Sequence, residues 1–130
     1  MIIGTGVDIV EIERIGRLLD RFGERFVRRT FSDVERAYCA GRPLPEQHYA
    51  ARFAAKEAFV KAIGTGFTQK IVWRDIGVVN EPSGQPLLVV NGRAREVMEQ
   101  LGATTAWVSL SHSKTHAVAV VVLEKMPASP

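Results

Sequence analysis

One segment in the middle of the chain sets most of what the fold can be. Residues 46–63, EQHYAARFAAKEAFVKAI, are rich in alanine, contain no glycine or proline, and are followed by a glycine. This pattern predicts a helix of about five turns. Apolar residues cover most of its surface, while Glu57 and Lys61 share one sector and Arg52 and Lys56 share another. Such a helix is buried on several sides, so we expect the rest of the chain to pack around it.

The segments on either side of this helix predict an α+β fold. The expected elements are, in chain order, a strand over 2–10, helices over 12–22 and from Ser32 toward Cys39, the central helix, strands over 71–80 and 87–90 around a turn at 82–86, a helix between Asn91 and Gly102, and strands over 104–111 and 116–124. Because a helix-rich half precedes a strand-rich half, we expect a mainly antiparallel sheet packed on the central helix.

The composition fits one globular domain. The chain has 130 residues, of which 46% are hydrophobic and 24% are charged. We expect one domain over residues 1–126 and a disordered tail over 127–130. Cys39 is the single cysteine, so an intramolecular disulfide is excluded and a structural zinc site is not expected. With no basic region at the N-terminus and no apolar run long enough for a bilayer, we expect a cytoplasmic protein that makes no membrane contact.

Asp8 is an isolated carboxylate on an otherwise apolar strand face. That face also holds Ile2, Gly4, Gly6 and Val10. The two glycines leave room for another backbone or a ligand to approach closely. Asp8 is therefore either a functional carboxylate or a residue at the strand end that caps the next helix.

Glu57 and Lys61 are the second candidate pair. They lie four residues apart and roughly 40° apart around the helix axis, on a stripe of apolar side chains. An exposed pair of this kind is an ordinary surface contact that contributes a few tenths of a kcal/mol. If the stripe is buried, the charges favour a binding or catalytic role, because buried charge is costly without a partner.

Two further motifs resemble known sites but lack their context. Gly64 and Gly66 follow a helix, whereas a phosphate-binding loop precedes one, so by themselves they indicate a helix stop. Ser109, Ser111 and His112 suggest a hydrolase, but the G-x-S-x-G elbow is absent. Strand alternation puts His112 on the inner face, where it is either a partly buried histidine with a backbone partner or a ligand contact.

The positive charge is concentrated early in the chain. Six arginines lie between positions 14 and 29, and most recur every three or four residues, which gives a basic stripe if helical geometry continues past Gly23. Solvated surface is one explanation, and a nucleic-acid-binding module is another. Phe22 and Phe26 fall at core spacing, however, and a nucleic-acid site would interleave exposed aromatic rings with its charges. A scaffold that oligomerises through its C-terminal strand is a third possibility.

Three segments together resemble one family. GVDIVEIERI at 6–15, RFAAKEAFVKAIGTG at 52–66 and SLSHSKTHAVAVVV at 109–122 are similar in sequence, order and spacing to the holo-acyl-carrier-protein synthases. The resemblance implies the 4′-phosphopantetheinyl transferase fold and a homotrimer with active sites between neighbouring subunits. It also implies transfer of 4′-phosphopantetheine from coenzyme A to a serine of an acidic acyl-carrier protein, and no nucleic-acid partner.

The resemblance also assigns roles to individual residues. It implies that Asp8 and Glu57 bind Mg²⁺ and that Lys61 contacts the coenzyme A diphosphate, which makes these three the catalytic residues. The other nucleotide-contacting positions are Arg52, Gly64, Gly66, Pro86 and His112. The arginines expected to dock the carrier are Arg14, Arg21 and Arg28. Either Glu57 or a water held by the metal accepts the serine proton, and the carrier belongs to fatty-acid or to polyketide synthesis.

Overall fold

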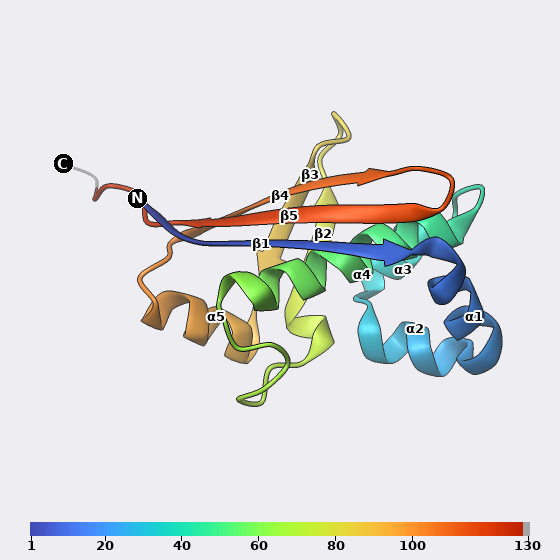
Figure 1. The fold of residues 1–130 in the computed structure, drawn as a ribbon, viewed down its shortest axis with the longest axis horizontal. Coiled ribbons are helices and arrows are strands. Elements are labelled where there is room, and N and C mark those ends of the chain that lie inside the picture. The colour runs from blue at the N-terminus through green and yellow to red at the C-terminus, as the bar shows by residue number, and fades with distance from the viewer. Residues whose placement is uncertain (129–130) are drawn as a thin grey trace.

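The central helix is the axis of the fold. The computed structural model describes residues 1–128, and the expected helix is α4, Pro45–Ala62. It lies beneath a three-stranded sheet, with the shorter helices arranged below and at both ends (Figure 1). Eleven of its residues are buried, which include most of its alanines together with Phe53, Phe59 and Val60. The prediction of a helix covered on several sides is confirmed.

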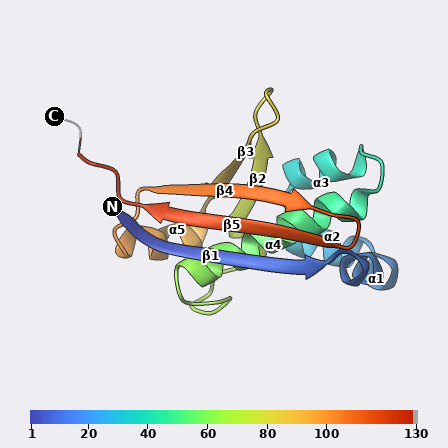
Figure 2. The same cartoon turned by 45° about the horizontal axis from the view of Figure 1, so that its top comes forward.

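The sheet above α4 is antiparallel, as predicted. Its strands are β1 (Ile2–Glu11), β4 (Thr105–His112) and β5 (His116–Glu124), in the order β1-β5-β4 (Figure 2). β5 is central, and alternate residues from Ala117 to Leu123 point inward and are fully buried. β1 and β4 are the two edge strands, so β5 separates residues on β1 from residues on β4.

β1 packs directly on the backbone of α4. A β-carbon on Gly6 would collide with the carbonyl oxygen of Ala58, and one on Gly4 with that of Ala62. The strand face that Asp8 shares with these glycines is therefore the face that meets the helix. The close approach predicted for the two glycines is made by another backbone.

Three short helices follow β1, where the sequence predicted two. They are α1 (Ile12–Phe22), α2 (Glu24–Thr30) and α3 (Asp33–Ala40). Gly23 has a φ of 53°, which ends α1 and starts α2 in a new direction. The arginine run is thus divided between two helices. Phe22, expected in the core, is instead 39% exposed because it lies at this break.

In the second half of the chain, one predicted strand is shorter than expected. The strand expected over 71–80 begins only at Ile76, because residues Trp73–Asp75 form a 3-10 turn, η1, in which the Asp75 carboxylate accepts from the amide of Val72. β2 (Ile76–Asn80) and β3 (Pro86–Val90) then form a separate two-stranded antiparallel hairpin. α5 (Gly92–Gln100) follows Asn91 as expected, although the Asn91 side chain makes no capping hydrogen bond.

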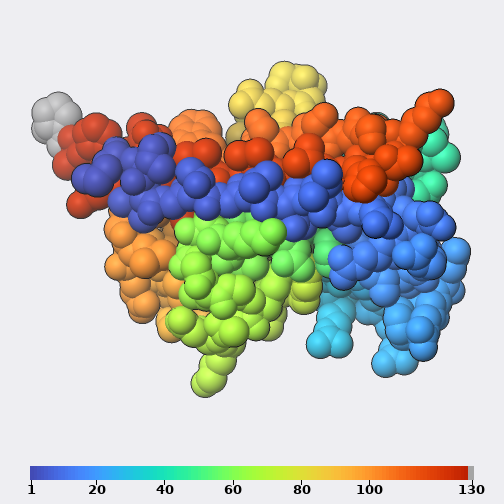
Figure 3. Space-filling model, viewed as in Figure 1, coloured from blue at the N-terminus to red at the C-terminus, as the bar shows by residue number. Residues whose placement is uncertain are grey.

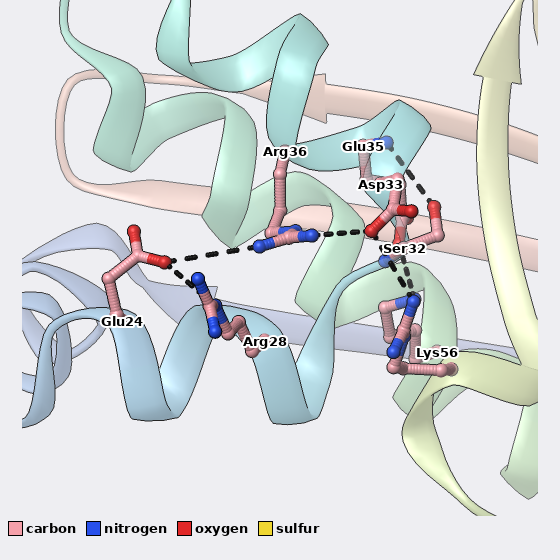
Figure 4. A network of polar contacts seen from close by, with 8 residues as sticks. Glu24, Arg28, Ser32, Asp33, Glu35, Arg36 and Lys56 are labelled. Carbon is pink, nitrogen blue, oxygen red and sulfur yellow. Dashed lines mark hydrogen bonds and ion pairs between the residues drawn. The ribbon is translucent and has the colours of Figure 1, made fainter.

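A buried ion pair ties α3, α4 and β2 together (Figure 4). The Lys56 ammonium donates to the Glu35 carboxylate at 2.7 Å and to the carbonyl oxygen of Ile76, and both charged side chains are fully buried. Glu35 also accepts from the amides of Ser32 and Val78, and the Ser32 hydroxyl accepts from the amide of Glu35. The predicted cap at Ser32 is confirmed, and its partner Glu35 is also the counterion of Lys56.

Two remaining points concern the chain as a whole. Within residues 1–128, no helix is both long and apolar enough to cross a membrane. The disordered tail expected over 127–130 falls partly outside the described residues, and Pro127 and Ala128 belong to no helix or strand.

We predict that Lys56→Met lowers the free energy of unfolding by about 3–5 kcal/mol, because it leaves the Glu35 carboxylate buried without a counterion. Urea denaturation measures this loss. Adding Glu35→Gln should recover part of it. The control is Arg95→Met, which breaks an exposed pair with Glu99 and should cost about 1 kcal/mol or less. Equal losses in both single variants would contradict the prediction.

Candidate functional site

The contact between β1 and α4 brings the three predicted catalytic residues together. The Lys61 ammonium donates to the Asp8 carboxylate at 2.9 Å and to the carbonyl oxygen of Val7 at 3.1 Å. Glu57 lies one helical turn before Lys61. The Asp8 side chain is 17% exposed and that of Lys61 is 54% exposed, so the group opens to solvent at the edge of the sheet. Figure 3 shows β1 as a surface band between β5 and the end of α4.

Glu57 is held in an environment that disfavours its charge. Burial raises the pKa of its carboxyl above the ordinary 4.5, and the negative charge of Asp8 raises it further, while Lys61 and Arg14 act in the opposite direction. Two carboxylates that repel each other beside one ammonium form a site that a cation would stabilise. Within residues 1–128, no third acidic, histidine or cysteine side chain completes a metal cluster, so the protein offers this carboxylate pair alone.

The turn after α4 uses its own amides internally. The amide of Gly64 donates to Lys61, and the amides of Thr65 and Gly66 both donate to the carbonyl oxygen of Val60 at 3.2 Å. Gly64 and Gly66 have φ values of 80° and 62°, and a β-carbon on either would meet no atom within 4 Å. These glycines end the helix, as the sequence indicated, and leave an open surface that a ligand can approach.

A second group of polar side chains lies at the other edge of the sheet. Arg52 is 2% exposed, donates to the Asn80 side chain at 2.7 Å, and stacks over the Tyr38 ring at 4.1 Å. Within the described part of the chain, its buried Nε has no hydrogen-bond partner. Arg42 stacks on the same ring at 3.8 Å. This group, which we call the basic cluster, consists of Tyr38, Arg42, His48, Arg52 and His112.

His112 and Pro86 lie on this second side, apart from the carboxylates. His112 ends β4, and its ring centroid is 6.2 Å from that of His48. It is exposed, with a contact from Nδ1 to the Ser113 carbonyl oxygen, so the partial burial considered for it is wrong because it stands at the strand end. Pro86 begins β3 opposite Asn80, the partner of Arg52. The predicted nucleotide-contacting residues of one chain are therefore divided between the β1 side and the β4 side of the sheet.

The arginine run forms a grooved surface on α1 and α2. Leu18, Phe22 and Phe26 line a hollow of about 270 Å³ whose rim carries Arg25 and Arg29. Arg14 lies over the Phe53 ring at 5.7 Å, and Arg21 lies over Phe22 at 5.1 Å. Arg28 differs from these, since it is paired with Glu24 at 3.1 Å (Figure 4).

The sheet face away from α4 carries large apolar side chains that no described residue covers. Its exposed side chains include Val7, Ile9, Trp107 and Val120, which are between 41% and 65% exposed. They project from all three strands of the sheet. Large apolar residues gathered on one face are typical of a surface that another protein covers.

Comparisons with known proteins identify the family. The sequence model of the 4′-phosphopantetheinyl transferase superfamily matches residues 4–121. The chain belongs to this superfamily. The holo-[acyl-carrier-protein] synthase of Syntrophus aciditrophicus is 48% identical over 124 residues, which cover 95% of this chain and 97% of that protein.

Solved structures of the superfamily share the fold. The holo-[acyl-carrier-protein] synthase of Neisseria meningitidis has a TM-score of 0.86 and 37% identity over 96% of this chain and all of that one. The Bacillus anthracis synthase, solved in complex with CoA (3′,5′-ADP), has a TM-score of 0.80 and 38% identity over 97% of this chain and 99% of that one. The α+β fold expected from the sequence is thus confirmed by superfamily members of the same size.

Sequence reasoning missed part of the basic cluster. In the sequence, Tyr38 and His48 are ordinary residues of two expected helices, and Arg42 is a residue of the Gly- and Pro-containing link between them. They come from the end of α3, the following loop and the first turns of α4. Their sequence signal is weak, since only the fold brings them beside Arg52 and His112.

We predict that Glu57→Gln stabilises the metal-free protein near neutral pH, because it removes a charge that burial and Asp8 disfavour. The pKa of Glu57 is raised in the folded state. The free energy of unfolding of the wild type is therefore highest below the ordinary pKa of 4.5 and falls as the pH rises from there through the raised pKa. The stability difference between variant and wild type should therefore grow with pH, as thermal unfolding in EDTA would show. The exposed Glu81→Gln is the control, and a pH-independent difference would contradict the prediction.

Proposed function

We propose that this chain transfers the 4′-phosphopantetheine group of coenzyme A to a serine of an apo-acyl-carrier protein. The products are the holo-carrier protein and adenosine 3′,5′-bisphosphate. The observation that carries the proposal is the group of Asp8, Glu57 and Lys61 at the contact of β1 and α4, in a superfamily member whose relatives are named for this reaction. The buried thiol of Cys39 fits a reducing compartment, so the cytoplasm is the proposed location.

Magnesium fits the carboxylate pair. Oxygen ligands from one or two carboxylates, completed by substrate phosphates and water, are how proteins usually hold Mg²⁺. Asp8 and Glu57 supply two such groups, and because burial and then the charge of Asp8 raise the pKa of Glu57, a cation there would offset the cost of its charge. When bound there, Mg²⁺ would neutralise negative charge on the coenzyme A diphosphate.

Lys61 would act on the same diphosphate. Phosphoryl transfer depends mainly on positioning and on neutralising charge at the departing oxygen. The Lys61 ammonium is half exposed and anchored by Asp8 and the Val7 carbonyl, so it can turn a remaining proton toward a phosphate oxygen. Its role is to stabilise the departing adenosine 3′,5′-bisphosphate while the carrier serine attacks the other phosphorus.

Two chains would complete one nucleotide site. The catalytic group lies at the β1 edge of the sheet, and the basic cluster with Pro86 lies on the β4 side. The unpartnered Nε of Arg52 beside Arg42 and His112 suits an anionic group such as a nucleotide phosphate. If the apolar sheet faces of neighbouring subunits meet, the β4 edge of one subunit can approach the β1 edge of the next. A homotrimer, as the resemblance implies, closes such contacts in a ring.

The grooved arginine surface would receive the carrier. Arg14 lies both on α1 and beside Glu57, whose pKa it lowers, so this surface borders the catalytic group. An acidic protein that docks along Arg14 and Arg21 would bring its serine to the diphosphate. Arg28 is the least available of the three proposed docking arginines, because Glu24 already neutralises it.

The first test is turnover. We expect Asp8→Asn and Glu57→Gln each to lower kcat by about 100-fold or more, because each removes one of two metal ligands. Mass spectrometry of an apo-carrier after incubation with coenzyme A measures the transfer, and circular dichroism checks the fold. Full activity of either variant at low magnesium would contradict the two-carboxylate site.

The second test is complementation between subunits. Asp8→Ala and Arg52→Ala should each be nearly inactive, but mixing them under conditions of subunit exchange should restore activity, because some contacts then join two intact halves. Light scattering should show an oligomer that Val120→Lys, on the apolar sheet face, disrupts. A fully active monomer, or a mixture that stays inactive after proven exchange, would show that each chain holds a complete site.

The third test concerns the carrier. Arg14→Glu and Arg21→Glu should raise the KM for the carrier about tenfold while leaving coenzyme A binding nearly unchanged, and added salt should slow the wild type. Arg28→Glu should have a smaller effect because of its pairing with Glu24. If carrier and coenzyme A affinity fall equally, or if rates ignore salt, the stripe is solvated surface.

A further inference from the structure

Three aromatic rings form a continuous stack that links α4, η1 and the loop after α4. The Phe53 and Trp73 rings are stacked with centroids 4.8 Å apart and planes at 24°, and the Trp73 and Phe67 rings are stacked at 3.9 Å and 26°. They come from three different segments, namely α4, η1 and the loop that follows α4. The stack thus joins that loop to the core.

The loop depends on this anchor for its conformation. Gln69 and Lys70 have φ values of 56° and 67°, which non-glycine residues adopt at a cost. Its polar contacts include the bond from the Thr68 hydroxyl to the Thr65 carbonyl oxygen and the bond from Arg93 to the Gln69 carbonyl oxygen, both exposed to water. The amide of Ile71 also donates to the carbonyl oxygen of Thr68. Exposed hydrogen bonds contribute little net stability, whereas the ring of Phe67 is partly buried against the core.

The same loop closes the last turn of α4. The amides of Thr65 and Gly66 donate to Val60, and that of Gly64 donates to Lys61. Phe67 directly follows this set of bonds. If its ring were released from Trp73, these bonds would open more often, and the helix end that carries Lys61 would fray.

We propose that Phe67 and Trp73 are positioning residues for coenzyme A binding. Their stacked rings fix the turn after α4, and the turn fixes the half-exposed Lys61 ammonium beside Asp8, where it meets the diphosphate. The rings act through Lys61 and do not touch the reacting atoms. The role rests on the proposed function, and it differs from general core packing because it predicts an effect on one substrate only.

The experiment compares Phe67→Ala with a conservative variant and a core control. Phe67→Tyr keeps a ring that can stack on Trp73. Ile15→Ala opens a cavity at a fully buried position on α1, which follows the end of β1 opposite the Gly4 contact, so it destabilises the fold away from the loop. Calorimetry measures the Kd for coenzyme A, steady-state kinetics the KM for each substrate, and hydrogen exchange the protection of the Thr65 and Gly66 amides.

In Phe67→Ala we expect the Kd and KM for coenzyme A to rise about tenfold, the KM for the carrier to stay within about twofold, and the two amides to exchange faster. Phe67→Tyr should restore all three. Ile15→Ala should lower the unfolding temperature and leave coenzyme A binding unchanged. Wild-type coenzyme A affinity in Phe67→Ala, or equal effects of Phe67→Ala and Ile15→Ala, would overturn the inference. Wild-type protein that neither binds nor consumes coenzyme A would instead overturn the proposed function, and the exchange rates would still report on the anchor.

Discussion

The direct contact between the backbones of β1 and α4 is the constraint on which the site depends. Only glycine at positions 4 and 6 lets the strand lie against the carbonyl oxygens of the helix, because any side chain there would collide with them. The strand is thereby held close enough for Asp8 to reach Lys61. The two glycines thus set the distance between the Asp8 carboxylate and the Lys61 ammonium.

Lys56 and Glu57 are adjacent in α4 but lie in different sectors of the helix, and their charges serve different purposes. Lys56 is fully buried and fixes α3 and β2 to the helix through Glu35 and a carbonyl group, so its charge stabilises the fold. Glu57, the next residue, lies near enough to Asp8 for that charge to raise its pKa and forms no ion pair with another described residue, so its charge stays available. The buried pair holds the helix in place, and the exposed sector can then keep charges that the fold itself disfavours.

Local signals carried the correct predictions. Alanine content, alternation and the Ser32 cap are properties of short windows, so α4, the inward face of β1 and the start of α3 could be deduced from the sequence. The Lys56 and Glu35 pair could not, because its two halves lie far apart in the chain and each resembles an ordinary surface charge. The 3-10 turn at Trp73 could not be predicted for a similar reason. Its apolar neighbours favour a strand, and the stacking of Trp73 on two rings from distant segments is seen only in the structure. The separation of Arg52 and His112 from the carboxylates was likewise visible only in three dimensions.

The carbonyl oxygen of Val60 has a consequence for the design of inhibitors. It occupies the amides of both Thr65 and Gly66, so the turn after α4 has no cradle of free backbone donors like that of a phosphate-binding loop. On the proposed function, recognition of the diphosphate rests on full charges from Lys61 and a metal. In a phosphate-binding loop, an uncharged diphosphate isostere could still accept hydrogen bonds from free backbone amides. In the turn after α4, the amides of Thr65 and Gly66 already donate to Val60, so such a compound would gain few hydrogen bonds there. Compounds that retain a negative charge, or that fill the open surface beside Gly64 and Gly66, are better suited to this turn.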